Sequence, residues 1–139
     1  MSSGTEPVSR LVLDTSAYSR LRHGHETVLD LVAIAESVLL PVTVLGELEA
    51  AFELGGRVKE NRVVLNDFLD EPYVSILPSD RSVARQYGQI FARLRRAGTP
   101  IPVNDIWIAA TTFDCGGHLL TFDRHFELIE GLQLTLLGA

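Results

Sequence analysis

Five short apolar-rich runs along the chain have the length of β-strands, and their apolar residues are continuous rather than alternating. The runs cover residues 10–14, 38–41, 73–77, 118–121 and 132–137. Continuous runs of this kind are typical of strands that are buried on both faces of a parallel sheet. Proline ends the second run at Pro41 and follows the third at Pro78, because proline cannot continue a hydrogen-bonded ladder.

Helices are predicted between these runs, at residues 26–36, 43–54, 57–70, 80–97 and 104–113. The clearest pattern is that of 80–97, where apolar residues recur at helical spacing behind the capping residue Asp80. In 43–54 the inward stripe is predicted to comprise Val44, Ala51 and Leu54, together with Glu47. Residues 1–9 show no periodicity and are predicted to be a flexible tail that precedes one domain, residues 10–139.

Strands that alternate with helices indicate an α/β fold. We therefore predict a three-layer α/β/α sandwich with a mainly parallel central sheet, in which 132–137 is an edge strand. A chain of 139 residues is long enough for one domain with a real core.

The composition narrows the class of protein. The single cysteine, Cys115, excludes an internal disulfide and favours a reducing compartment. No apolar run is long enough to span a membrane, and the first residues lack the pattern of a signal peptide. We therefore expect a cytoplasmic protein without a membrane partner. The net charge of −6 argues against binding nucleic acid through bulk charge, although eleven of the twelve basic residues are arginines.

Two acids are predicted at the carboxyl ends of strands, where ligands bind in parallel sheets. Asp14 ends the first run, and Asp123 comes two residues after the fourth. Each acid has a structural alternative: Asp14 could cap a helix that opens at Thr15, and Asp123 could belong to a turn.

Two further acids lie on predicted helices. Glu47 on an inward stripe needs a metal ion or a basic partner, because an unpaired buried carboxylate is costly. Asp105 stands in the first turn of its helix, after Asn104. The alternative for Asp105 is a favourable interaction with the helix dipole, with Asn104 as the cap.

Four converging carboxylates would repel one another strongly unless a cation neutralised them. Oxygen ligands select Mg²⁺ or Mn²⁺, and the chain has no cysteine–histidine pattern for zinc. Such an ion activates water and stabilises charge on a phosphoryl group, which is the chemistry of phosphodiester hydrolysis.

The chain resembles the PIN-domain family, and within it the VapC-type ribonuclease toxins of bacterial toxin–antitoxin pairs. Four motifs over residues 10–137 carry the resemblance: Leu11–Ser16, Val42–Leu48, Ile101–Ala110 and Leu119–Phe126. The resemblance assigns the four family acids to Asp14, Glu47, Asp105 and Asp123. It implies that Asp14, Asp105 and Asp123 hold Mg²⁺ or Mn²⁺, while Glu47 orients or deprotonates the attacking water or binds a second ion.

The resemblance also assigns supporting hydroxyls and partners. Thr15 is expected to supply the hydroxyl that follows or supports the first aspartate, and Thr121 matches the threonine before the last acid. The family implies endonucleolytic cleavage of RNA such as tRNA or rRNA, a homodimer, and an antitoxin that blocks the site. One position departs from the family pattern: His125 stands where a second aspartate is common. A surface histidine is the simpler interpretation of that residue.

Arg124, Arg93 and Arg96 are candidate contacts for the RNA backbone. The alternative for the helix arginines is a solvated face. A HAD-type phosphatase is disfavoured because Ser16 stands where it needs a second aspartate, and a response-regulator receiver because Lys59 is the only lysine. Two alternatives remain open: a non-catalytic PIN-like module that binds RNA or a partner, and a PIN nuclease of RNA processing.

Overall fold

The computed structural model describes residues 8–138, so most of the tail predicted at residues 1–9 lies outside the described residues. Within this range the elements follow one another in the order β1 (Arg10–Leu13), α1 (Thr15–Arg22), α2 (Glu26–Ile34), β2 (Ser37–Pro41), α3 (Val42–Leu54), α4 (Val58–Leu69), β3 (Val74–Leu77), α5 (Arg81–Arg96), α6 (Val103–Cys115), β4 (His118–Thr121), the 3-10 helix η1 (Arg124–Leu128) and β5 (Leu134–Leu136). No helix within residues 8–138 is long and apolar enough to cross a lipid bilayer.

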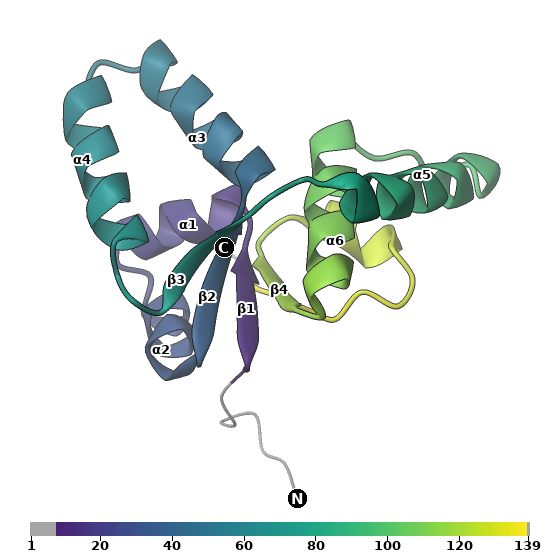
Figure 1. The fold of residues 1–139 in the computed structure, drawn as a ribbon, viewed down its shortest axis with the longest axis horizontal. Helices are drawn as coiled ribbons and strands as arrows, with labels where there is room; N and C mark the ends of the chain where they lie inside the picture. Colours follow the sequence, from purple (N-terminus) through teal and green to yellow (C-terminus); the bar gives the residue numbers. More distant parts are fainter. Residues whose placement is uncertain (1–7, 139) are drawn as a thin grey trace, which may run out of the picture.

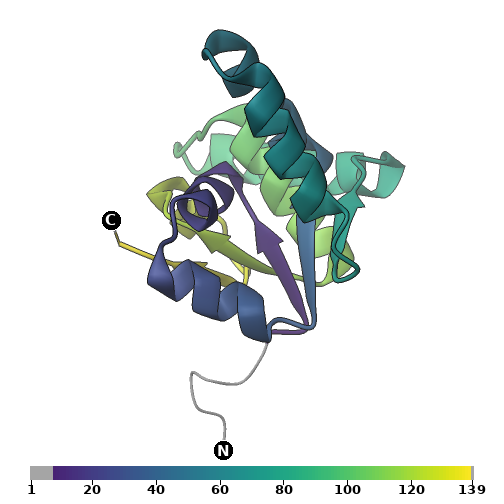
Figure 2. The same ribbon diagram turned by 90° about the vertical axis from the view of Figure 1, so that its left-hand side faces the viewer.

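The five strands form one sheet in the order β3-β2-β1-β4-β5, and every neighbouring pair is parallel. Helices α1 and α2 lie on one side of the strands, and α5 and α6 lie on the other (Figures 1 and 2). The predicted three-layer sandwich is therefore confirmed, and its last strand is indeed at an edge. The central strand β1 joins β2 to β4, although β4 comes more than a hundred residues later.

The sheet centre is the core of the molecule. Residues 11–13 of β1, 38–40 of β2 and 119–120 of β4 are buried on both faces, as their continuous apolar sequence predicts. The edge strand β3 is only partly covered. On the side of the sheet opposite α1 and α2, Tyr87 of α5 stacks on Trp107 of α6 with ring centroids 4.2 Å apart.

The inward stripe of α3 differs from the prediction. Its buried residues are Val44, Leu48 and Phe52, whereas Leu54 is 91 % exposed. The predicted stripe turned the helix to the opposite side of Val44 from the observed one. The reason is that α3 extends past the carboxyl ends of the strands and packs beside α4 (Figure 1). Glu47 lies about 100° around the helix from the centre of this stripe. It is therefore half-buried, at the flank of the packed face rather than within it.

Two local features were not predicted at their observed places. Helix α6 begins at Val103 with Pro102 at the N-cap, so Asn104 is not the cap and its side chain is free for another partner. The segment after Asp123 forms η1, which is too short for its periodicity to be recognised in the sequence.

Candidate active site

The carboxylate of Asp14 lies at the carboxyl end of β1 and is 4 % exposed. Its Oδ1 accepts hydrogen bonds from the Ala17 amide at 2.8 Å and from the Ser16 hydroxyl at 2.7 Å, so Asp14 caps α1. Its Oδ2 accepts a hydrogen bond from the Thr121 hydroxyl. The structural alternative for Asp14 is therefore correct as a description of its bonding, and the same bonds fix the carboxylate at the sheet edge.

Thr121 and Ser16 join the ends of the two central strands. The Thr121 hydroxyl oxygen accepts a hydrogen bond from the Asp123 amide at 2.9 Å, while the hydroxyl itself donates to Asp14. The Ser16 hydroxyl oxygen accepts one from the Phe122 amide at 3.0 Å. These bonds hold the segment after β4 against the segment after β1, so that Asp123 has a defined position relative to Asp14.

Asp105, Asp123 and His125 form a compact group beside this junction. His125 Nδ1 lies 3.1 Å from Asp105 Oδ2 and 3.0 Å from Asp123 Oδ1. Asp105 comes from the first turn of α6, whereas Asp123 caps η1 and accepts a hydrogen bond from the His125 amide at 2.9 Å. The Asp105 side chain is 13 % exposed and the His125 ring is 50 % exposed, so the group is open to solvent on the histidine side.

Glu47 is held by two donors. The Thr15 hydroxyl donates to Glu47 Oε1 at 2.5 Å, and the Asn104 amide donates to Glu47 Oε2 at 3.3 Å. The hydroxyl of Thr15, the residue that follows Asp14, therefore supports the glutamate rather than Asp14. Thr15 opens α1 with its side chain turned toward α3, which leaves Ser16 to bind Asp14.

The charges of the acids are coupled. Burial raises the pKa of Asp105 to about 6, and the charges of Asp123 and Glu47 add to this effect, while the His125 ring opposes it. Burial also raises the pKa of Asp14, against the lowering effect of the Thr121, Ala17 and Ser16 hydrogen bonds, and the Asp123 charge contributes to the increase. The four acids thus form one electrostatic unit with an excess of negative charge.

A divalent cation fits this unit. Within residues 8–138, one group of three potential ligands has its donor atoms within 4.8 Å of one another: Asp105, Asp123 and His125. A cation there would favour the charged form of Asp105, whose pKa is raised by burial and by the charges of Asp123 and Glu47. Carboxylate oxygens favour Mg²⁺ or Mn²⁺. Asp14 contributes no atom to this group, and its charge acts from the adjoining strand end.

The sequence singled out all four acids but missed the roles of their neighbours. Ser16 binds Asp14, a role that the sequence did not indicate, and Asn104, which was expected to cap a helix, binds Glu47. The interpretation of His125 as a surface histidine was incomplete, because its half-exposed ring contacts two of the acids. The available signal was its place at a position where the family commonly has an acid.

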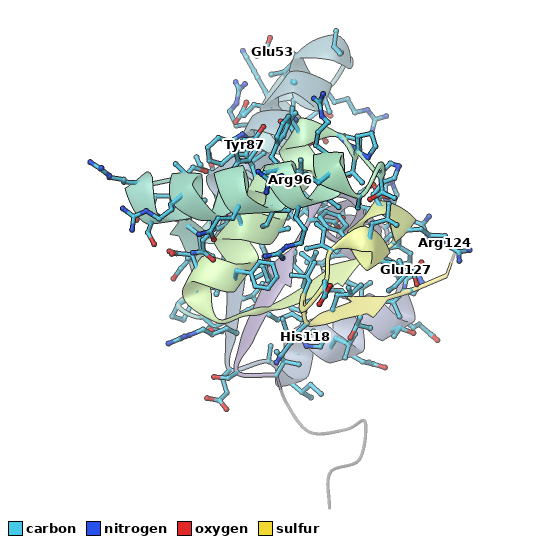
Figure 3. All side chains as sticks on the ribbon, turned by 90° about the vertical axis from the view of Figure 1, so that its right-hand side faces the viewer. Glu53, Tyr87, Arg96, His118, Arg124 and Glu127 are labelled. Carbon is cyan, nitrogen blue, oxygen red and sulfur yellow. The ribbon has the colours of Figure 1, made fainter. Side chains whose placement is uncertain are left out.

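The three candidate arginines are exposed. Arg93 and Arg96 line a shallow hollow along α5 with Arg85, Gly88, Gln89 and Ala92. Arg124 follows Asp123 directly, and its Nε lies 3.4 Å from Glu127 Oε1. Figure 3 shows Arg96 on α5 and, toward the edge of the same view, Arg124 beside Glu127.

Comparison with known proteins gives consistent matches over nearly the whole chain. The pattern of the PIN domain matches residues 11–132. Ribonuclease VapC5 of Mycobacterium tuberculosis (strain ATCC 25618 / H37Rv) is 27 % identical over 120 residues, which are 86 % of this chain and 87 % of that protein.

Solved structures share the fold. A chain of VapBC2 from Rickettsia felis, solved bound to a DNA fragment from its promoter, superposes with a TM-score of 0.81 at 22 % identity, covering 92 % of this chain and 98 % of that one. A chain of the DNA-bound VapBC of Salmonella typhimurium superposes with a TM-score of 0.79 at 25 % identity, covering 91 % and 97 %.

Proposed function

The chain belongs to the PIN-domain family, and from this premise we propose that it is a divalent-metal-dependent endoribonuclease, the toxin of a VapBC-type pair. One observation carries the proposal. Asp105 and Asp123 converge at the carboxyl edge of a parallel sheet, with Asp14 and Glu47 in the same electrostatic unit. The similarity to Ribonuclease VapC5 supports RNA as the substrate.

Asp14, Asp105 and Asp123 are the residues that would hold Mg²⁺ or Mn²⁺. Bound there, the cation would lower the pKa of a water molecule and stabilise negative charge on the phosphoryl group. The protein prepares this site through hydrogen bonds: Thr121 orients Asp14 and, through the Asp123 amide, the segment that carries the last acid. The rigid helix α6 holds Asp105 at its first turn.

We propose that Glu47 orients or deprotonates the attacking water; the alternative is that it binds a second ion. Thr15 and Asn104 each occupy one lone pair of a different carboxylate oxygen, so each oxygen keeps a further lone pair for the water. These two donors also fix the rotation of the carboxylate. In hydrolysis the water oxygen forms a new P–O bond while the P–O bond to the leaving oxygen breaks, and the proton taken up by Glu47 is available to that leaving oxygen.

Arg124, Arg93 and Arg96 are proposed to bind phosphates of the RNA backbone. Their guanidinium groups are exposed and suit phosphate geometry. We propose structured RNA, a tRNA or an rRNA, as the substrate class. The activity would reside in the cytoplasm, in a homodimer that a cognate antitoxin protein inhibits by covering the acidic site.

Cleavage of total bacterial RNA by the purified protein tests the proposal. Discrete fragments are expected with Mg²⁺ or Mn²⁺ and none with EDTA. Asp105→Asn and Glu47→Gln should each lower the rate by at least about a hundredfold, because each removes a group that acts on the reacting atoms. Glu53→Gln is the matched control on the same helix, since Glu53 is exposed and pairs with Arg62 at 3.0 Å.

The outcomes separate the remaining alternatives. Absence of cleavage by folded, antitoxin-free protein in either metal would contradict the proposal and favour a binding module. Cleavage that yields a defined mature RNA end, without toxicity when the protein is expressed alone, would identify an RNA-processing nuclease.

A further inference from the structure

We propose that His125 is a ligand of the divalent cation through Nδ1, and that this nitrogen shifts the preference of the site from Mg²⁺ toward Mn²⁺. The inference rests on the proposed function only in that a divalent cation binds at Asp105 and Asp123. It gives this chain a site with mixed oxygen and nitrogen ligands in place of carboxylates alone.

The spacing of the three donor atoms carries the first step. Nδ1 lies 3.1 Å from Asp105 Oδ2 and 3.0 Å from Asp123 Oδ1. Neighbouring ligands of a six-coordinate ion with bonds of about 2.1 Å stand roughly 3.0 Å apart, the edge of an octahedron. The distance from His125 Nδ1 to each carboxylate oxygen therefore equals the distance between two neighbouring ligands of one ion.

The chemistry of the shared atom carries the second step. Both carboxylate oxygens are acceptors, so without metal a hydrogen on Nδ1 is what binds the ring to them. When the neutral ring carries its one hydrogen on Nε2 instead, the Nδ1 lone pair is free for a cation, which takes the place that the hydrogen held between the ring and the two acids. The ring is half exposed, so an ion can reach this point from solvent.

The backbone carries the third step, because it keeps the nitrogen ligand in place. The His125 amide donates to Asp123 Oδ1 at 2.9 Å; Asp123 caps η1, and His125 is the second residue of that helix. Behind them the Thr121 hydroxyl oxygen accepts from the Asp123 amide. The acid and the histidine therefore form one preorganised pair, and ion binding needs little movement of either.

The change from oxygen to nitrogen determines the preference. Mg²⁺ binds oxygen ligands and gains most from negative charge, whereas imidazole suits transition metals. Mn²⁺ shares the preference of Mg²⁺ for carboxylate oxygen. As a first-row transition-metal ion it nevertheless binds an imidazole nitrogen more readily than Mg²⁺ does. An imidazole in place of a third carboxylate removes one negative charge, which weakens Mg²⁺ binding more than Mn²⁺ binding.

Metal titration of the intact protein by calorimetry, with Mg²⁺ and Mn²⁺ separately, measures this preference. His125→Asp should lower the ratio of Mn²⁺ to Mg²⁺ affinity by at least about tenfold, chiefly by strengthening Mg²⁺ binding. His125→Ala should weaken Mn²⁺ binding. His23→Asp is the matched control, because it makes the same change at an exposed histidine outside the site and should leave the ratio unchanged.

Electron spin echo spectroscopy of bound Mn²⁺ detects the bond itself. Modulation from a directly bound imidazole nitrogen is expected in the parent protein and in His23→Asp, and it should vanish in His125→Asp while Mn²⁺ remains bound. If His125 only donates a hydrogen bond to the acids, its loss in His125→Ala should strengthen the binding of both ions. That result would overturn the inference.

RNA cleavage distinguishes this failure from failure of the proposed function. Mn²⁺ that binds without nitrogen coupling, in a protein that cleaves RNA and loses activity in Asp105→Asn, overturns the role of His125 and leaves the nuclease intact. Absence of both metal binding and cleavage contradicts the two proposals together.

Discussion

At the scale of single residues, structural and chemical roles coincide in this site. Asp14 is a helix cap by its bonds to Ser16 and Ala17, and it is also one of four electrostatically coupled acids. The sequence left these roles as alternatives, because a cap and a ligand use the same short acidic side chain at the same place after a strand. A buried carboxylate with three donors is held rigidly, which suits both roles.

The raised pKa of Asp105 predicts a specific pH dependence of stability. Because its pKa rises from 3.8 to about 6 on folding, the folded chain binds the proton more tightly than the unfolded chain. Without metal, the free energy of unfolding should therefore fall as the pH rises from about 4 to about 6. Asp105→Asn removes this penalty and should stabilise the metal-free protein by about 2 kcal/mol at pH 7, with little effect at pH 4.

Urea unfolding in EDTA at the two pH values measures the effect. Asp67→Asn, at an exposed acid of α4, should change stability little at either pH. A destabilised Asp105→Asn protein at pH 7 would show that the carboxylate is stabilised by its His125 contact more than it is penalised by burial and repulsion. The stabilised variant should also be the inactive one, which is the usual relation between stability and function at a charged site.

At the scale of elements, the hydrophobic pattern predicted the type and the approximate bounds of elements long enough to show a repeated spacing. The strand 118–121 was predicted at its observed bounds, and the helix 43–54 differs from α3 by one residue. The register of α3 was not predicted, because an amphipathic pattern with alanine and leucine on two sides fits more than one stripe. The short η1 has too few residues for a period to show. Yet η1 carries His125 into the acidic group.

The junction between α6 and β4 has a strict steric requirement. A Cβ at Gly117 would meet Val12 Cγ2 at 2.8 Å and Cys115 Sγ at 2.9 Å, so the backbone must pass close to β1 there. Gly117→Ala should destabilise the protein by about 1–3 kcal/mol and displace the start of β4. Gly88→Ala, in α5 with open space around it, should instead stabilise by about 0.5–1 kcal/mol.

Thermal and urea unfolding of the two alanine variants make the comparison. RNA cleavage should fall in Gly117→Ala even below its unfolding temperature, because β4 positions Thr121 and through it Asp14 and Asp123. Equal stability of Gly117→Ala and the parent protein would show that the junction relaxes without cost.

At the scale of the whole molecule, the site exists because β1 and β4 are neighbours. Their pairing places Leu13 opposite Leu120, and this brings Asp14 and Asp123 to one edge. The apolar runs predicted a parallel sheet but carry no information on strand order, because any two buried parallel strands present similar surfaces. The position of Asp14 and Asp123 after parallel strands predicted that they lie at one edge of the sheet. That β1 and β4 are neighbours, and the contacts of Ser16, Asn104 and His125, required the packed structure.

The charge of the whole molecule opposes RNA binding, so binding must depend on local arginines. With a net charge of −6, the phosphate contacts have to come from exposed guanidinium groups, and Arg93, Arg96 and Arg124 are proposed to supply them.

Replacing any one of these three arginines by Gln should weaken binding of catalytically inactive protein to RNA. The slope of log affinity against log salt should fall by about 0.7–0.9 for each contact removed. Fluorescence anisotropy between 50 and about 200 mM salt gives this slope. Arg62→Gln is the control, because Arg62 is paired with Glu49 at 2.5 Å and should leave the slope unchanged. An unchanged slope in all three variants would locate the RNA on another face.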